Sequence, residues 1–492
     1  MTNKRTSCYA VSLFLFLMPF ITWAQTTTSC STEYQIEMFG SASTGKYTPF
    51  WIVSNKYGAF PLDAVTGNAS LRAGVFHDHS FRNGIYWNVG ADMIATTPRY
   101  RHVYVQQLFA SVQYKSLNLT VGSKENYSSL WDHALSSGDM VLSSNARPIP
   151  EINLSVPRFT PIPFTQGHIQ FRGNMAHGQS FDSRYIQSFT KGESAYVKNI
   201  LLHSKSVHIR ILDPQNKIPL TAVIGLRHHA QWGGTSTDKK LGKQPQSFKN
   251  FARVFLGKGG GDDASVSDQV NVLGNHYGSY DIRFGYLNPA FDIHVYMQHY
   301  FDDKSGMELY NRPDGLYGFQ LDLQNFPLIS KIVAELLLTR HQSGPVHYIG
   351  YDHAIYPGYG GGNDNYYNNG EYTTGVSYFN RGLGSPLLSS PEYNENGILG
   401  FRNNRIRAFH LGLQGYLSKQ VSYRILATSS EGWGTMNEPF LKKENNFLSA
   451  TKISYCHPRL ENWLLSAEVG ADFGATYGNN VGISLSVMRR GK

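Results

Sequence analysis

Apolar and polar residues alternate along many segments of this chain. Residues 87–95, WNVGADMIA, place tryptophan, valine, alanine and methionine at alternate positions, with asparagine, glycine and aspartate between them. The same period of two runs through FDIHVYMQHY at 291–300 and YGFQLDLQN at 317–325, and it returns near the end in FHLGLQGYL, WLLSAEVGADF and VGISLSV. Successive side chains of a β-strand point to opposite faces, so this pattern predicts strands with one apolar and one polar face.

The polar face of these strands carries glycine, serine, glutamine and carboxylates, and the segments are many, long and spread along the chain. Apolar and polar residues also alternate along the strands of a soluble β-sandwich. Apolar outward and polar inward positions on strands of about 10 residues are typical of an outer-membrane barrel, which satisfies its backbone groups by closing the sheet. At roughly 26 residues per strand and connection, the chain would supply about 18 strands. We therefore predict an all-β protein with one large transmembrane antiparallel β-barrel over residues 25–492.

The first 24 residues follow a different pattern. Lys4 and Arg5 precede an apolar run over residues 11–21, and the small residue Ala24 ends the segment. This is the pattern of a secretory signal peptide cleaved after Ala24, and it is too short for a lasting membrane helix. The chain is therefore expected to leave the cytoplasm. Farther along, no apolar run reaches the about 18 residues that a transmembrane helix needs.

Residues 130–164 do not alternate well. Prolines at 148, 150, 157, 161 and 163 argue against central strands, because proline cannot donate to a strand ladder. This segment is predicted to be a plug in the lumen, a periplasmic cap with a helical turn or two, or an extended crossover. Near the C-terminus, residues 481–487 are expected to close the barrel, with residues 488–492 as a short tail.

Net charge and cysteine content add little evidence about function. The formal net charge is +9 at pH 7, and cleavage of the signal peptide would remove two of the positive charges. This modest basic excess fits an acidic partner without identifying one. Beyond Cys8, the cysteines are Cys30 and Cys456, near the two ends of the mature chain. They could pair, but the sequence does not show that their Cα atoms lie within disulfide reach.

Motifs for catalysis or metal binding are weak. In LGKGGGDDASVSD, residues 256–268, the lysine precedes the glycines, so a flexible loop is favoured over a phosphate-binding loop. Its aspartates offer oxygen ligands for calcium, but acidic residues in a glycine-rich loop are more often simply solvated. His228 and His229 are strand neighbours that point to opposite faces, and we find no second histidine cluster at ligand spacing. No Gly-x-Ser-x-Gly elbow occurs. We expect a non-enzymatic protein without cofactor or metal.

Nine stretches stand out in order along the chain and together span most of residues 140–415. They are SSNARPIPEI (143–152), LLHSKSVHIRI (201–211), GLRHHAQWGG (225–234), VFLGKGGG (254–261), QVNVLGNHYGSYDIRFGY (269–286), QHYFDDKSGM (298–307), DGLYGFQLDL (314–323), NYYNNGEYTTGVSYFNRGLGSPLL (365–388) and NNRIRAFHLGL (403–413). These stretches resemble the capsule assembly protein Wzi family in its Bacteroidetes-type form, and the ends of the chain match it only in general character.

The resemblance implies an outer-membrane barrel that acts as a lectin-like anchor, helping to attach and organise capsular or exported polysaccharide at the cell surface. It implies 18 strands, a small helical element on the periplasmic side and a lumen largely blocked by loops. Its implied partners are capsular polysaccharide, outer-membrane lipids and the capsule export machinery, and nucleic acid is not among them. A porin-like channel for small solutes is the alternative, supported by the barrel size and the polar inward face.

Residues 351–388 are too rich in glycine and asparagine for one lipid-facing strand, so their first half is predicted to be a long loop. A tyrosine ring covers the apolar face of a sugar while its hydroxyl reaches a sugar hydroxyl, and asparagine both donates and accepts. Arginine suits an acidic sugar. An aromatic girdle, turn structure or packing of loops in the lumen would explain the same residues. The candidate sugar-contact residues are Trp232, Tyr351, Tyr356, Tyr359, Asn365, Tyr366, Tyr367, Asn368, Asn369, Tyr372 and Arg381.

Overall fold

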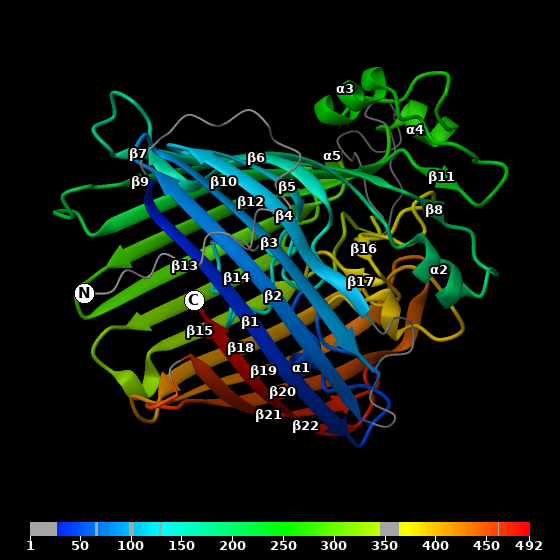
Figure 1. Cartoon of the computed structure of the whole chain (residues 1–492). Coiled ribbons are helices and arrows are strands. Elements are labelled where there is room, and N and C mark those ends of the chain that lie inside the picture. The colour runs from blue at the N-terminus through cyan, green and yellow to red at the C-terminus, as the bar shows by residue number, and fades with distance from the viewer. Residues whose placement is uncertain (1–26, 64–66, 98–102, 127–129, 345–363, 461) are drawn as a thin grey trace.

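The computed structural model describes residues 27–63, 67–97, 103–126, 130–344, 364–460 and 462–492. Within these residues, 18 antiparallel strands form one closed barrel (Figure 1). Each strand pairs with the next strand of the wall along the chain, and β1 (Thr27–Ser43) pairs with both β2 (Asn68–Phe81) and β22 (Asn480–Gly491), which closes the sheet. The predicted transmembrane β-barrel and its strand number are confirmed.

The remaining strands follow in chain order. The first half of the wall continues with β3 (Ile85–Thr96), β4 (Val103–Tyr114), β5 (Leu117–Ser123), β6 (Glu151–Pro161), β7 (Ile169–Gln179), β9 (Leu201–Leu212) and β10 (Leu220–Trp232). The second half contains β12 (Asn275–Leu287), β13 (Phe291–Phe301), β14 (Gly315–Leu323), β15 (Lys331–Leu338), β18 (Ile406–Tyr416), β19 (Val421–Gly434), β20 (Pro439–Cys456) and β21 (Trp463–Gly474).

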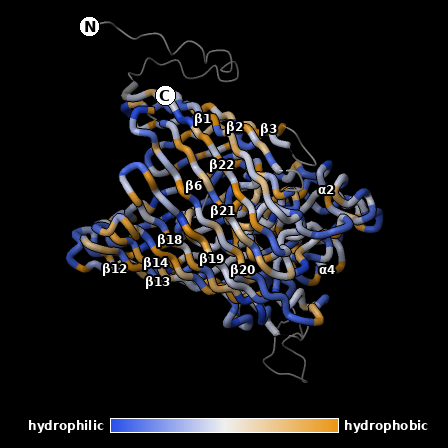
Figure 2. The backbone as a smooth tube through the Cα atoms, turned by 90° about the horizontal axis from the view of Figure 1, so that it is seen from below, coloured by the Kyte–Doolittle hydropathy of each residue, from blue (hydrophilic) through white to orange (hydrophobic). Residues whose placement is uncertain are grey.

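The strands present apolar side chains outward and polar side chains inward. In β3, Met93 is on the outer face, whereas its neighbour Asp92 is buried on the inner face. In β14, Phe319 points outward and Gln320 inward. Hydrophobic and hydrophilic residues accordingly alternate along the wall (Figure 2). An apolar exterior and a ladder that closes on itself are what a membrane-spanning sheet requires, because backbone groups in the hydrocarbon must be paired within the protein.

The two ends of the barrel differ. The connections at the end that carries both termini are short turns, whereas the opposite end carries the long connections and most of the helices (Figure 1). In outer-membrane barrels the short turns face the periplasm and the long connections face outward. The long connections contain α1 (Phe50–Val53), α2 (Ser183–Thr190), β8 (Val197–Lys198), β11 (Thr235–Ser236), α3 (Phe248–Leu256), α4 (Val266–Val270), α5 (Lys304–Met307), β16 (Ser377–Tyr378), β17 (Arg381–Gly382) and η2 (Pro391–Tyr393). A further short helix, η1 (Pro327–Ile329), lies in the β14–β15 turn.

None of the helices that the structure describes is both long and apolar enough to cross a membrane.

Residues 130–150, which we call the inner segment, pack against the inner face of the wall. The hydroxyl of Ser136 and the amide of Ser137 donate to Glu335 of β15, each over 2.7 Å. The amide of Met140 donates to the side chain of Gln298 of β13 over 2.7 Å. Asp139 pairs with Arg227 of β10. These contacts hold the inner segment inside the barrel, and its role as a plug stays a prediction.

Residues 364–405, which we call the mouth segment, lie above the inner segment and close to the outward end. The hairpin of β16 and β17 belongs to it, and nearly all of residues 374–391 are buried. The backbone of Leu383 accepts from the amide of Ser143 over 2.7 Å, which joins the two segments. Apolar side chains from both segments and from α1 form one core inside the barrel. Side chains of these segments therefore pack part of the barrel interior as they would the core of a soluble protein, and the interior is not filled by water alone.

Two expectations about the wall were wrong. Residues 151–161 form β6 despite Pro157 and Pro161, because the pairing of β6 with β7 has a register shift between Val156 and Thr160. Pro157 lies in that shift and beyond the pairing with β5, which ends at Ser155, so it breaks no ladder hydrogen bond there. Closure by residues 481–487 is confirmed, but β22 continues to Gly491, so the expected tail is part of the strand.

We predict that the unaltered protein carries little current in a planar bilayer and that Glu335→Ala raises the open-channel activity. The substitution removes the carboxylate that holds Ser136 and Ser137 against the wall. Glu395→Ala, at an exposed ion pair of the outward end, is the matched control and should leave the current unchanged. A steady current through the unaltered protein as large as that of an open porin would contradict this prediction.

Candidate functional site at the barrel mouth

A cleft of about 620 Å³ opens at the outward end of the barrel. Its walls come from segments that are distant in the sequence: the β1–β2 connection, helix α2, residues 378–397 of the mouth segment, and single residues of β3, β4 and the inner segment. We call it the mouth cleft. Aromatic and amide side chains make up much of its lining, among them Tyr47, Phe60, Tyr104, Tyr185, Phe379, Asn394 and Asn396.

Helix α2 positions the aromatic wall of the cleft. Ile186 and Phe189 are three residues apart, so they fall on one face of the helix and are buried against the protein. Tyr185 is only half-buried, and its ring meets that of Phe379 at a centroid distance of 5.4 Å and an angle of 64°. This edge-to-face contact fixes a rigid aromatic corner at the cleft, with part of the tyrosine ring open to solvent.

Cations line the same cleft. The guanidinium carbon of Arg147 lies 3.4 Å from the ring centre of Tyr104 and 4.5 Å from that of Phe379, which is a cation–π contact with both rings. Arg147 thus adds positive charge and N–H donors to the lining. Lys191, directly after α2, is exposed at the rim.

Two ion pairs brace the cleft. Arg381 pairs with Glu392 over 2.7 Å deep in the lining. Burial lowers the pKa of Arg381, but the Glu392 carboxylate outweighs this and leaves it above its ordinary value. At the rim, Lys46 pairs with Glu395 over 2.9 Å, and this bond raises the pKa of Lys46 and lowers that of Glu395. Burial raises the pKa of Glu392, and the Arg381 guanidinium offsets part of this rise.

The chemistry of the mouth cleft suits a sugar chain. Aromatic faces cover the apolar C–H surface of a pyranose ring, and amide side chains bind its hydroxyl groups. Arg147 and Lys191 add positive charge for a carboxylate-bearing sugar. The cleft is open to the outside, so a polymer can pass across it instead of having to enter the lumen.

The three described tyrosines of the predicted sugar site are fully buried. The hydroxyl of Tyr366 donates to Asp314 over 3.2 Å, that of Tyr367 donates to the backbone of Met140, and that of Tyr372 donates to Gly233 over 3.4 Å. Burial raises the pKa of all three hydroxyls well above the ordinary value, so they remain protonated donors. Their rings pack the mouth segment, and their contact with sugar stays a prediction.

The predicted asparagines shape the mouth segment. The side chain of Asn368 donates to the backbone of Phe401 over 2.8 Å and accepts from its amide over 2.7 Å. Asn369 accepts from the amides of Glu371 and Tyr372, which closes a turn. Asn365 accepts from the side chains of Asn368 and Asn404. Each amide thus satisfies backbone or neighbouring polar groups inside the barrel mouth.

The remaining candidate sugar-contact residues do not lie together either. Trp232 is buried at the end of β10, where its ring packs against Phe251 of α3 at a centroid distance of 6.0 Å. Arg381 is the one described candidate that lines the mouth cleft, through its pair with Glu392. Tyr351, Tyr356 and Tyr359 lie outside the described residues. Neither Cys30 nor Cys456 forms a disulfide in the described part of the chain.

Sequence reasoning missed most of the mouth cleft. Tyr185, Phe379, Asn394 and Asn396 come from segments that meet only in the folded barrel. A local signal existed at Arg147, which lies within the family-like stretch SSNARPIPEI. Its ring partners, Tyr104 and Phe379, are distant in the sequence and are brought to Arg147 only by the fold.

These features define an outer-membrane β-barrel whose interior is packed by its own connections and whose outer mouth carries an aromatic, polar cleft. The chain belongs to the capsule assembly protein Wzi family, whose model matches residues 56–389. The resemblance seen in the nine stretches is thereby confirmed, as is an outer-membrane location. No curated protein matches the sequence at a significant level.

Among solved structures, the chain is similar to Wzi of Escherichia coli, described as a carbohydrate-binding β-barrel of the outer membrane involved in group 1 capsule assembly. The identity is 13% and the TM-score 0.57, with 92% of this chain and 83% of that chain covered. OccK5 (OpdH) of Pseudomonas aeruginosa matches at 9% identity and TM-score 0.47, covering 95% and 99%. OmpT of Vibrio cholerae matches at 8% identity and TM-score 0.37, covering 95% and 100%. The first likeness shows a shared fold, and the other two are too weak to add to it.

We predict that Tyr367→Phe lowers the free energy of unfolding by about 1–3 kcal/mol, because Met140 and Ser385 lose their partner inside the barrel. Tyr367→Ala should cost about 3–5 kcal/mol, since it also leaves a cavity. Urea unfolding in lipid vesicles, followed by the heat-modifiable shift on gels, measures both. Tyr416→Phe, at a half-exposed ring outside the mouth segment, is the control. Wild-type stability of Tyr367→Ala would contradict the packing role.

Proposed function

We propose that this protein is a lectin-like component of the outer membrane that helps attach and organise capsular or exported polysaccharide at the cell surface. Membership of the Wzi family supports the link to capsule assembly. The similar E. coli barrel, which is described as carbohydrate-binding, supports the ligand class. The observation that carries the proposal is the mouth cleft, because it presents aromatic rings, amides and cations together on the outward side.

The polymer would lie across the mouth cleft. Tyr185 and Phe379 offer ring surface to a sugar, Asn394 and Asn396 bind hydroxyl groups, and Arg147 holds an acidic substituent. Each such contact is weak by itself. Because a polysaccharide repeats its epitope and the membrane carries many copies of the protein, weak contacts add up to firm retention.

In this proposal the protein works without catalysis and without a cofactor. It holds the polysaccharide at the cell surface and forms no covalent bond with it. Outer-membrane lipids surround the apolar wall, and the capsule export machinery delivers the polymer. Nucleic acid is not a partner. Residues 1–24 serve as the cleaved signal peptide that directs the chain out of the cytoplasm.

A channel for small solutes is the second candidate. Two polar chambers of about 590 Å³ and 680 Å³ within the barrel favour it, the larger lined by Arg158, Arg172 and His203 of the inner wall. Arg147 lines both the larger chamber and the mouth cleft. The packed inner and mouth segments count against free passage, and the bilayer measurement described above separates the two functions.

The proposal predicts that Tyr185→Ala and Asn396→Ala weaken binding of capsular polysaccharide purified from the source strain. Loss of one ring contact worth about 0.5–1.5 kcal/mol corresponds to about 2- to 12-fold weaker binding. Phe248→Ala removes an exposed aromatic ring at the same end of the barrel but outside the cleft, so it should bind as the unaltered protein does. Biolayer interferometry of the detergent-solubilised protein measures the affinity.

The same variants are tested in cells that lack the chromosomal gene. Cell-bound polysaccharide should fall, and released polysaccharide should rise, in the deletion strain and in the double variant of Tyr185 and Asn396. Phe248→Ala should restore retention. If the deletion strain keeps its polysaccharide, the anchor function is wrong. If the double variant retains and binds polymer normally, the anchor function stands but the mouth cleft is not its site.

A further inference from the structure

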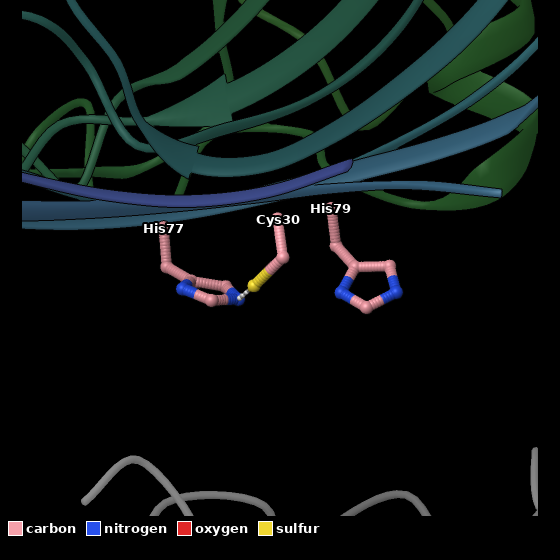
Figure 3. Close-up of side chains that lie close together, drawn as sticks. All are labelled: Cys30, His77 and His79. Carbon is pink, nitrogen blue, oxygen red and sulfur yellow. Dashed lines mark hydrogen bonds between the residues drawn. The ribbon is translucent and has the colours of Figure 1, made fainter. Parts of the chain in front are cut away.

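Cys30, His77 and His79 lie together on the outer face of the barrel, at the end that carries both termini (Figure 3). Cys30 belongs to β1 and the two histidines to β2, where Cys30 is the register partner of His79. One ligand atom from each of the three side chains lies within 4.8 Å of the others, and the Cys30 Sγ is 3.8 Å from the His77 Nε2. The side chains point away from the wall; Cys30 and His77 are directed at each other, and His79 lies on the other side of Cys30 (Figure 3).

The donor set fits a zinc-type cation. Thiolate sulfur and imidazole nitrogen are the ligands that zinc prefers, with bond lengths that place neighbouring ligand atoms about 3.3–3.6 Å apart in a tetrahedral site. The observed separations need only small side-chain rotations to reach this geometry. Three protein ligands would leave the fourth position of the tetrahedron to water.

The surroundings already orient the two imidazoles. The Nδ1 of His77 lies 2.7 Å from the hydroxyl of Thr32, which leaves Nε2 directed at the Cys30 sulfur. An outer hydrogen bond on the second ring nitrogen is the usual support of a metal-binding histidine. The ring of Trp87 stacks on that of His79 at 5.5 Å and 8° and also contacts His77 at 5.2 Å.

His79 offers one ring nitrogen to the cluster. Its Nε2 is inaccessible to solvent and makes no hydrogen bond among the described residues, but in Figure 3 this atom lies on the side of the ring that faces away from Cys30. The site therefore rests on the short distances among the three side chains and on the hydrogen bond that orients His77.

A metal ion bound at this position of β1 and β2 would stabilise the edge of the sheet. Pairing of β1 with the closing strand β22 begins at Tyr34, whereas pairing with β2 extends back to Thr27, with a register shift between Thr27 and Ser29. Residues 29–33 therefore have a sheet neighbour on one side only, like an edge strand. A metal ion held by Cys30 and the two histidines would fasten this edge to β2.

We propose that Cys30, His77 and His79 form a binding site for one zinc-type divalent cation, which fastens the N-terminal part of β1 to β2 at the periplasmic end. The sequence carries a signal for this pair of histidines: one residue separates them, so both fall on the same face of a strand. The expectation that no second histidine cluster lies at ligand spacing overlooked it.

Zinc titration of the full-length protein in detergent, followed by calorimetry, tests the site. The unaltered protein should bind one Zn²⁺, and Cys30→Ser or His79→Ala should weaken binding by at least about 10- to 100-fold, the loss seen for outer partners of a metal site. Cys456→Ser and His457→Ala are matched controls, because they remove an exposed cysteine and its neighbouring histidine elsewhere on the barrel. Both controls should bind as the unaltered protein does.

Three further readouts separate metal binding from effects on folding. Heat-modifiable migration on gels shows that each variant has a closed barrel. Co²⁺ in place of Zn²⁺ should give a thiolate-to-metal absorption band that Cys30→Ser lacks and Cys456→Ser keeps. Added zinc should slow amide exchange in residues 29–33 of the unaltered protein. Equal zinc affinity of the unaltered protein and folded Cys30→Ser, or no binding at all, would overturn the proposal.

Discussion

The attachment of the inner segment to the barrel wall by buried charged groups is the interaction on which the rest of the structure depends. Arg227 of β10 lies between Asp139 of the inner segment and Asp281 of β12, and Gln298 donates to both carboxylates. Such pairs add little net stability when compared with apolar packing, but removing one partner costs about 3–5 kcal/mol. They therefore specify one position for a segment that has no strand of its own, and a different placement would leave an unpaired charge in the lumen.

The position of the inner segment also determines the arrangement of residues at the outer surface. Tyr367 connects the mouth segment to Met140 of the inner segment and also accepts from Ser385 within the mouth segment, and the backbone of Leu383 binds Ser143. The mouth segment in turn sets Phe379 against Tyr185 of α2, which forms the corner of the mouth cleft. A surface that binds a flexible polymer benefits from rigid aromatic contacts, because little conformational entropy is then lost on binding. The packed interior thus supports the proposed binding face.

The wall could be predicted from the sequence because alternation is a local signal: residues 87–95 and 317–325 show by themselves which face meets lipid. Strand β6 was missed because a bulge accommodates Pro157, and a bulge depends on the register with neighbouring strands. The tyrosines at 366, 367 and 372 stand out in the sequence as a group, but local sequence does not tell whether a loop turns outward or folds into a lumen. The mouth cleft combines residues as distant as Tyr47 and Asn394, so only the fold brings it into view.

The central claim is that an ordered mouth, supported from within, holds polysaccharide on the outside of a closed barrel. The most direct measurement is a structure of the protein bound to an oligosaccharide fragment of the capsule of its own strain. We expect the fragment to lie across the mouth cleft between α2 and residues 391–397, with the inner segment unmoved. A fragment threaded through the lumen past a displaced inner segment would contradict this account and would favour a channel.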